Sequence, residues 1–107
     1  MIINDIKNMK NGWFVGNFRP AAFSTEVCEV AHHSYKKGNI AKKHYHKIST
    51  EINYLLAGTM KVNGKTIEQG SIFILEPWET SDTEFLSDVE LIIVKVPSSV
   101  DDKYVVA

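Results

Sequence analysis

The sequence contains a single cysteine, Cys28, among its 107 residues. No disulfide can therefore form within the chain, and a zinc site built on several cysteines is excluded. No apolar run approaches the roughly 20 residues that a helix needs to cross a bilayer. Hydrophobic residues make up 44% of the chain and charged residues 23%, as in ordinary soluble globular proteins. We therefore expect a soluble protein without membrane contact.

The first residues, MIINDIKNMKNGW, contain Asp5 and lack a long apolar stretch followed by small residues, so they do not resemble a secretory signal. A cytoplasmic location is the resulting expectation. The length suits one domain over residues 1–107, because two cores would leave each half too little buried apolar surface. Residues 98–107 form a tail that either frays or docks as an edge strand, on the domain or on a partner.

Strong net charge is also missing, since the balance is only −1 and gives no overall attraction to nucleic acid or anionic lipid. The charges are nevertheless unevenly placed. Seven lysines and one acid lie from Lys36 to Lys65, whereas eight acids and one lysine lie from Glu76 to Asp102. The two segments either lie on neighbouring strands and form solvated pairs, or the lysines form a basic rim that attracts an anionic ligand. No nucleic-acid partner is expected.

Helix signals are weak, because no long segment has apolar residues at helical spacing between a cap and a stop. Short runs rich in β-branched and aromatic residues recur instead, separated by turn-forming residues. They predict strands at about 13–18, 25–35, 41–47, 50–57, 59–62, 65–68, 71–75, 81–86 and 89–96. Asn63-Gly64 predicts a tight type I′ hairpin, because both central residues need positive φ. The pattern indicates an all-β domain, either an antiparallel barrel or a sandwich.

Two histidines one residue apart are the clearest chemical feature. Side chains alternate along a strand, so His44 and His46 point to the same side. A turn through 47–49 would fold Glu51 back beside them. Two imidazoles and one carboxylate form a metal site with open positions, which suits a divalent ion of Fe, Mn, Zn, Ni or Co. The spacing does not choose among these metals.

The residues Gly38, His44, His46, Glu51 and Gly58 are separated by five, one, four and six positions. This pattern resembles the first conserved motif of the cupin superfamily, and it spans about a fifth of the chain. The resemblance implies a single small jelly-roll β-barrel of about eight antiparallel strands. It also implies that His44, His46 and Glu51 are metal ligands inside the barrel.

The second cupin motif is degenerate in this sequence. In the family it ends in a histidine that serves as the fourth metal ligand, but the candidate segment 70–82 has Asp82 at that place, and no histidine follows His46. The fourth protein ligand is therefore Asp82, or Glu84 on the same strand face, or it is absent. Asp82 is equally well interpreted as an ordinary turn or strand-start residue.

His32 and His33 are neighbours, so on a strand one points inward and the other outward. The inward one is either a proton carrier, a further ligand, or a hydrogen-bonded residue of the barrel wall. Together with Asp82 and Glu84, these two histidines are the candidate catalytic residues.

The strand that carries Glu51 is also apolar on its other face, at Ile52, Tyr54 and Leu56. A strand that is apolar on both sides is usually covered on both sides. We therefore expect a homodimer formed by packing sheets face to face. The alternative is a monomer with a few exposed apolar residues.

These observations favour a metal-dependent enzyme that acts on a small polar or anionic, sugar-like molecule. The resemblance implies isomerase, lyase or dioxygenase chemistry of the cupin type. The alternative is a non-catalytic module that binds or senses a small ligand, which the degenerate second motif favours. Both hypotheses name a small molecule as the partner.

Overall fold

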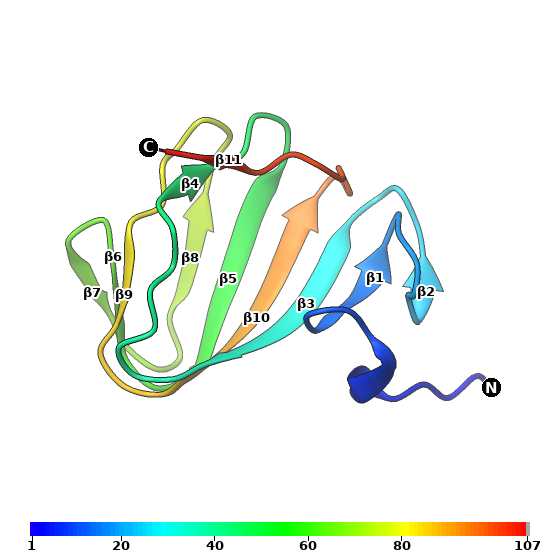
Figure 1. The fold of residues 1–107 in the computed structure, drawn as a ribbon, viewed down its shortest axis with the longest axis horizontal. Coiled ribbons are helices and arrows are strands. Elements are labelled where there is room, and N and C mark those ends of the chain that lie inside the picture. The colour runs from blue at the N-terminus through cyan, green and yellow to red at the C-terminus, as the bar shows by residue number, and fades with distance from the viewer. Residues whose placement is uncertain (107) are drawn as a thin grey trace.

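The computed structural model describes residues 1–106 as an all-β chain with one short 3-10 helix, η1 (Ile6–Asn8) (Figure 1). Each of the predicted strand regions contains an observed strand, so the all-β prediction is confirmed. The strands are β1 (Trp13–Gly16), β2 (Phe23–Ser24), β3 (Glu29–Tyr35), β4 (His44–Tyr45), β5 (Thr50–Ala57), β6 (Met60–Val62), β7 (Lys65–Ile67), β8 (Ile72–Leu75), β9 (Thr83–Phe85), β10 (Val89–Val96) and β11 (Tyr104–Val105).

The strands form a six-stranded sheet of order β2-β1-β3-β10-β5-β8, called the main sheet below, and two small sheets, β7-β6-β9 and β11-β4. The expected count of about eight antiparallel strands is therefore wrong for residues 1–106. Eleven strands are present, and β1 pairs with β2 in parallel. Backbone pairing does not close the sheets into one barrel in this part of the chain, because the segment that carries β4 is joined to the segment that carries β9 only by the isolated bridges His44–Ser81 and Ile40–Glu84.

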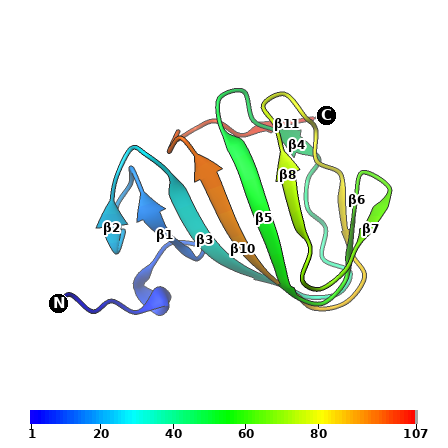
Figure 2. The same cartoon turned by 180° about the vertical axis from the view of Figure 1, so that it is seen from behind.

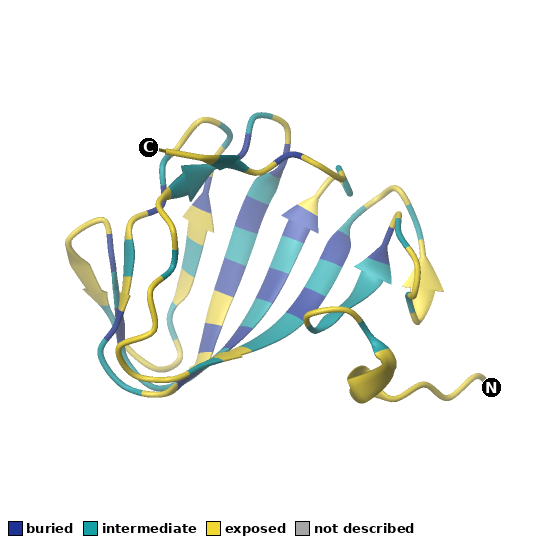
Figure 3. Ribbon diagram, viewed as in Figure 1, coloured by how far each residue is buried: buried dark blue, intermediate teal, exposed yellow. Residues whose placement is uncertain are grey.

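The hydrophobic core lies between one end of the main sheet and the small sheet β7-β6-β9. Alternate residues of β5 and β10 point inward, which Figure 3 shows as alternating bands of burial along the strands. Burial of these side chains supplies the main driving force for folding. The buried core cluster consists of Leu55, Met60, Val62, Phe85, Val89, Leu91 and Ile93.

Two local features follow the sequence closely. The β6–β7 hairpin turns at Asn63 and Gly64, whose φ values of 51° and 79° confirm the predicted turn. The tail docks on its own domain, because β11 pairs with β4. Ala107, the last residue of the predicted tail, lies outside the described residues. No helix among residues 1–106 is long and apolar enough to cross a membrane.

The outer face of the main sheet is apolar and open. Ile52 faces Ile74 across the β5–β8 pair, and Tyr54 faces Ile72. Ile72 and Ile74 are 66% and 53% exposed. Figure 2 shows this face without another strand of residues 1–106 in front of it. The homodimer therefore stays a prediction, and the surface that it requires is present.

Candidate metal centre

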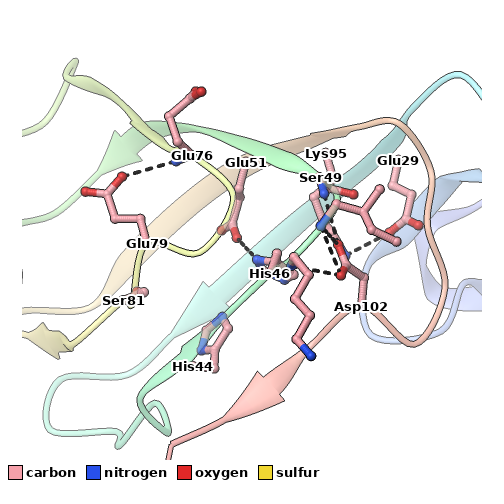
Figure 4. A network of polar contacts seen from close by, with 12 residues as sticks. Glu29, His44, His46, Ser49, Glu51, Glu76, Glu79, Ser81, Lys95 and Asp102 are labelled. Atoms are coloured by element: carbon pink, nitrogen blue, oxygen red, sulfur yellow. Dashed lines mark hydrogen bonds and ion pairs between the residues drawn. The ribbon is translucent and has the colours of Figure 1, made fainter.

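Figure 4 shows His44, His46 and Glu51 converging on the inner side of the main sheet. His44 belongs to β4, His46 follows it, and Glu51 is the second residue of β5. One ligand atom of each lies within 4.8 Å of the others. The side chains of His46 and Glu51 are buried, with only 9% and 12% of their surface exposed. The structure thus brings together the three residues that the sequence indicated.

A turn at Lys47, Ile48 and Ser49 returns the chain from His46 to Glu51. The backbone N–H groups of all three turn residues donate to the carboxylate of Asp102, at 2.9 to 3.2 Å. The Ser49 hydroxyl donates to the carbonyl oxygen of Pro97 at 2.8 Å. Asp102 is only 2% exposed. The tail therefore fixes the turn that places Glu51 beside the histidines.

The hydrogen bond at His44 selects the nitrogen that can bind a metal. Its Nδ1 lies 2.8 Å from the carbonyl oxygen of Lys42. A carbonyl only accepts, so Nδ1 carries the proton and Nε2 keeps its lone pair. At His46, Nδ1 lies 3.4 Å from Oε2 of Glu51. The two rings are perpendicular, with centroids 5.3 Å apart.

Burial dominates the electrostatics of this cluster. Burial, with smaller contributions from the charge of Lys95 and from His44, lowers the pKa of His46 to about 4. His46 is therefore neutral at neutral pH, as a metal ligand must be. Burial raises the pKa of Glu51, against the opposing effect of His44 and Lys95. The neutral imidazole of His46, the imidazole of His44 and a buried carboxyl group fit a divalent ion, which would offset the cost of burying the carboxylate charge.

The structure places Asp82 and Glu84 outside this cluster. His44 exchanges two backbone hydrogen bonds with Ser81, and Ser81 is buried at the inner side. Because side chains alternate, the two acids flank inward positions and are themselves exposed. The carboxylate of Asp82 lies 3.8 Å from Nζ of Lys43. The placement of Asp82 as a possible fourth ligand, counted from Pro77, does not agree with this register. No fourth ligand joins the cluster within residues 1–106.

His32 and His33 do point to opposite faces of β3. Nε2 of His32 lies 2.9 Å from Oε2 of Glu90 on the outer face. His33 points inward, and its Nδ1 lies 3.0 Å from the hydroxyl of Tyr35. Burial lowers the pKa of His33 and raises that of Tyr35, so both are neutral near pH 7. The negative charge of Glu51 raises the pKa of Tyr35 further.

A cavity of about 440 Å³ adjoins the cluster, a volume typical of small-molecule sites. His33, Tyr35, His44, His46 and Glu51 all contribute to its lining. Its cationic residues are Lys10, Arg19, Lys95 and Lys103. None of the seven lysines between Lys36 and Lys65 lines it, so the alternative of a basic rim formed by that segment finds no support at this cavity. Two of those lysines instead pair with acids of the other segment, at 3.5 and 3.8 Å.

Sequence reasoning missed Lys95, Glu29 and Asp102 as residues of the site. A signal existed for Lys95: Val89, Leu91 and Ile93 alternate along a strand, and the next position on that face is Lys95. No comparable signal marks Asp102. Asp102 contributes to the site only when the tail folds back onto the turn at 47–49, which lies more than 50 residues earlier in the sequence.

No protein-family model and no curated protein matches the sequence. Solved structures do match the fold. KdgF from Halomonas sp. has a TM-score of 0.66 at 20% identity, covering 72% of this chain and 74% of that one. A cupin protein from Bacteroides fragilis has a TM-score of 0.57 at 18% identity, covering 75% and 74%. The chain has the cupin fold.

Oxalate decarboxylase from Bacillus subtilis shares this cupin fold, with a TM-score of 0.66 at 18% identity over 76% of the chain. The match spans only 24% of that enzyme. At such identities the likeness concerns the cupin fold and leaves activity open.

Proposed function

We propose that this cupin-fold protein is a metal-dependent enzyme that acts on a small polar or anionic molecule. The observation that carries the proposal is the convergence of His44, His46 and Glu51 within 4.8 Å, beside a cavity of about 440 Å³. Three protein ligands leave coordination positions open, as catalytic metal sites require. Cupin-fold neighbours that include a decarboxylase support an enzymatic role.

The three ligands would hold a divalent ion of Fe, Mn, Zn, Ni or Co. Such an ion would act as a Lewis acid toward an oxygen of the substrate. The turn fixed by Asp102 keeps Glu51 next to His46, and the carbonyl of Lys42 keeps Nε2 of His44 free. The chain thus holds its donor atoms in place before an ion arrives.

Tyr35 and His33 are the groups of this cavity that suit proton transfer. The hydroxyl of Tyr35 gives its proton to Nδ1 of His33, 3.0 Å away, while it accepts one from a carbon of the substrate. The electron pair left on that carbon moves toward an adjacent carbonyl oxygen or expels a leaving group. The reverse transfer returns the proton. Isomerase and lyase chemistry use this step, so we favour them over dioxygenase chemistry.

Elemental analysis tests the metal site. The purified or reconstituted protein is expected to hold one transition metal per chain, and His46→Ala is expected to hold almost none. His32→Ala is the matched control. It removes a histidine from the outer face of β3, and the variant should keep full metal occupancy. If the wild type holds no metal after purification and takes none up on reconstitution, the proposal is wrong.

Deuterium exchange separates the enzyme from the binding module. NMR of small sugar acids and 2-oxo acids in D₂O is expected to show metal-dependent exchange of a carbon-bound proton, with a loss of about 100-fold in Tyr35→Phe. Binding of a ligand without exchange or turnover in the metal-loaded protein would favour the non-catalytic module. Consumption of O₂ with these compounds would favour a dioxygenase.

A further inference from the structure

The lysine-rich segment contains one acidic residue, the acid-rich segment contains one lysine, and these two residues are neighbours in the main sheet. Glu51 is the one acid between Lys36 and Lys65, and Lys95 is the one lysine between Glu76 and Asp102. In the main sheet, Lys95 on β10 is the direct cross-strand partner of Glu51 on β5. On its other side, Lys95 is the partner of Glu29 on β3. The inner face therefore carries one cation between two carboxylates.

Glu29 and Trp13 hold the ammonium group of Lys95 at the cavity. Nζ of Lys95 lies 3.4 Å from Oε1 of Glu29 and 5.5 Å from the centre of the Trp13 ring. The second oxygen of Glu29 accepts a hydrogen bond of 2.9 Å from the Ser98 hydroxyl. Lys95 is 8% exposed, and both it and Glu29 contribute to the cavity lining.

The geometry of the Lys95–Glu29 pair is not that of an ion pair that serves stability alone. A charge-assisted N–H···O bond is normally about 2.7 to 2.9 Å long, so the contact at 3.4 Å leaves Lys95 poorly satisfied. An ammonium group has three donors, and this pair engages one. Apolar residues of similar volume usually stabilise a fold as well as a buried ion pair does.

We propose that Lys95 binds a carboxylate group of the substrate beside the metal centre. The inference rests on the proposed function and narrows it to substrates that carry a carboxylate. Lys95 donates hydrogen bonds to the carboxylate from one side, while a divalent ion held by His44, His46 and Glu51 would have positions open to a second oxygen function of the same molecule. Glu29 positions the ammonium group and balances its charge when no substrate is bound.

Malonate serves as the test probe, with malonamide as its neutral counterpart. Trp13 reports binding in a Trp78→Phe background, because the chain has only two tryptophans and Trp13 lies next to Lys95. The metal-loaded protein is expected to bind malonate and not malonamide. Lys95→Met is expected to weaken malonate binding about 10- to 100-fold, as the loss of a charge-assisted bond implies. Lys103→Met, which removes another cavity cation, is expected to change it less than about threefold.

Two further variants separate binding from folding. Lys95→Met with Glu29→Gln removes both charges and avoids an unpaired buried carboxylate, and it should show the same loss of binding. Glu29→Gln alone keeps the ammonium group and leaves an amide oxygen as an acceptor that positions it, so this variant should bind malonate at least as tightly as the wild type. An equal loss in Glu29→Gln would show that the pair only maintains the shape of the cavity, and it would overturn the inference.

Metal analysis of the same samples distinguishes this inference from the proposed function. Full metal occupancy with reduced malonate binding in Lys95→Met supports both. Malonate binding that depends on Lys95 in a protein without metal supports the carboxylate site and contradicts the enzyme proposal. Unchanged binding in Lys95→Met, or no binding by the wild type, overturns the carboxylate site whatever the metal content.

Discussion

The two faces of the main sheet carry charged and apolar residues in the reverse of the usual arrangement. At the end of the sheet near β4, the inner face carries Glu29, Lys95 and Glu51, all of them buried. The outer face of the same strands and of β8 is apolar and exposed. Its large apolar residues with exposed side chains are Tyr54, Leu56, Ile72, Ile74 and Val96. A sheet with one solvated face normally shows the reverse pattern.

We propose that the inner face binds an ion and an anion and that the outer face binds a second copy of the chain. Buried charges are costly unless they are paired or coordinate a ligand, so the inner face indicates a site for an ion and an anion. An exposed apolar face indicates a protein partner. The chain exposes 6856 Å², whereas a compact monomer of this size exposes about 6,000 Å². The excess, to which the exposed residues Met1 to Ile3 also contribute, is comparable to the roughly 800 Å² that each partner buries in a standard interface.

The largest effect is expected from a charge on the outer face. We expect two copies to pack through this face, which includes Ile74 on the edge strand β8, paired with Ile52 on β5. Ile74→Glu should raise the dimer Kd about 1,000-fold, or by about 4 kcal/mol, because two carboxylates would be buried without partners. Sedimentation velocity over a range of protein concentrations measures the change.

Val105→Glu is the control for that experiment, since Val105 is equally exposed, at 55%, but lies on β11. This variant should dimerise like the wild type. A wild type that is monomeric at micromolar concentration would contradict the predicted dimer and leave the outer face without an explanation.

The second largest effect is a loss of stability when the Lys95–Glu29 ion pair of the inner face is broken. Lys95→Met should lower the free energy of unfolding by about 3 kcal/mol, because it leaves Glu29 buried without a counter-charge. The double variant with Glu29→Gln should recover most of this loss. Urea denaturation of the four proteins gives the coupling energy. Independent, additive effects would show that the two groups do not interact.

Asp102→Asn should cost about 2 kcal/mol of stability, since the carboxylate receives three backbone N–H groups of the turn at 47–49. It should also weaken metal binding, because that turn positions Glu51. Asp101→Asn is the matched control at the exposed neighbour, and it should change stability by less than about 0.5 kcal/mol. Equal effects of both variants would argue against the role of Asp102.

The same carboxylate predicts a pH dependence. Burial alone would raise the pKa of Asp102, but hydrogen bonds from Ser49, Lys47 and Ile48 outweigh it, and the pKa is lowered. The group is therefore more acidic in the folded than in the unfolded chain. Its contribution is complete above the ordinary Asp pKa of about 3.9 and is lost as the pH falls through the folded value. The stability difference between wild type and Asp102→Asn should shrink over that acid range, and a constant difference would contradict this.

The smallest effect is expected at Asp82, on the outer side of the metal centre. Asp82→Asn removes only a half-exposed pair with Lys43 at 3.8 Å, so stability should fall by less than about 1 kcal/mol. Metal content should stay at the wild-type level. A loss of metal in this variant would show that Asp82 moves inward and serves as a ligand.

Local rules predicted a large part of this molecule. Alternation along strands and turn chemistry located the strands, the hairpin at Asn63-Gly64, and the shared side of His44 and His46. The alternation of side chains along a strand also predicted that His32 and His33 point to opposite faces, but it did not predict which one points inward. That depends on which face of β3 meets the rest of the chain. The sequence left Asp82 open between a ligand, counted in register from Pro77, and an ordinary turn residue. The backbone bonds between His44 and Ser81 set the register that places Asp82 on the exposed side.

The sequence by itself indicated which residues form the candidate metal centre, because they lie within one strand, one turn and the next strand. Only the tertiary structure decided what surrounds them. The order β3-β10-β5 places Glu29, Lys95 and Glu51 side by side, and the docking of the tail brings Asp102 to the turn. These neighbours come from distant segments, and their pairing is fixed by sheet order and by the burial of the shared core, which no local pattern encodes.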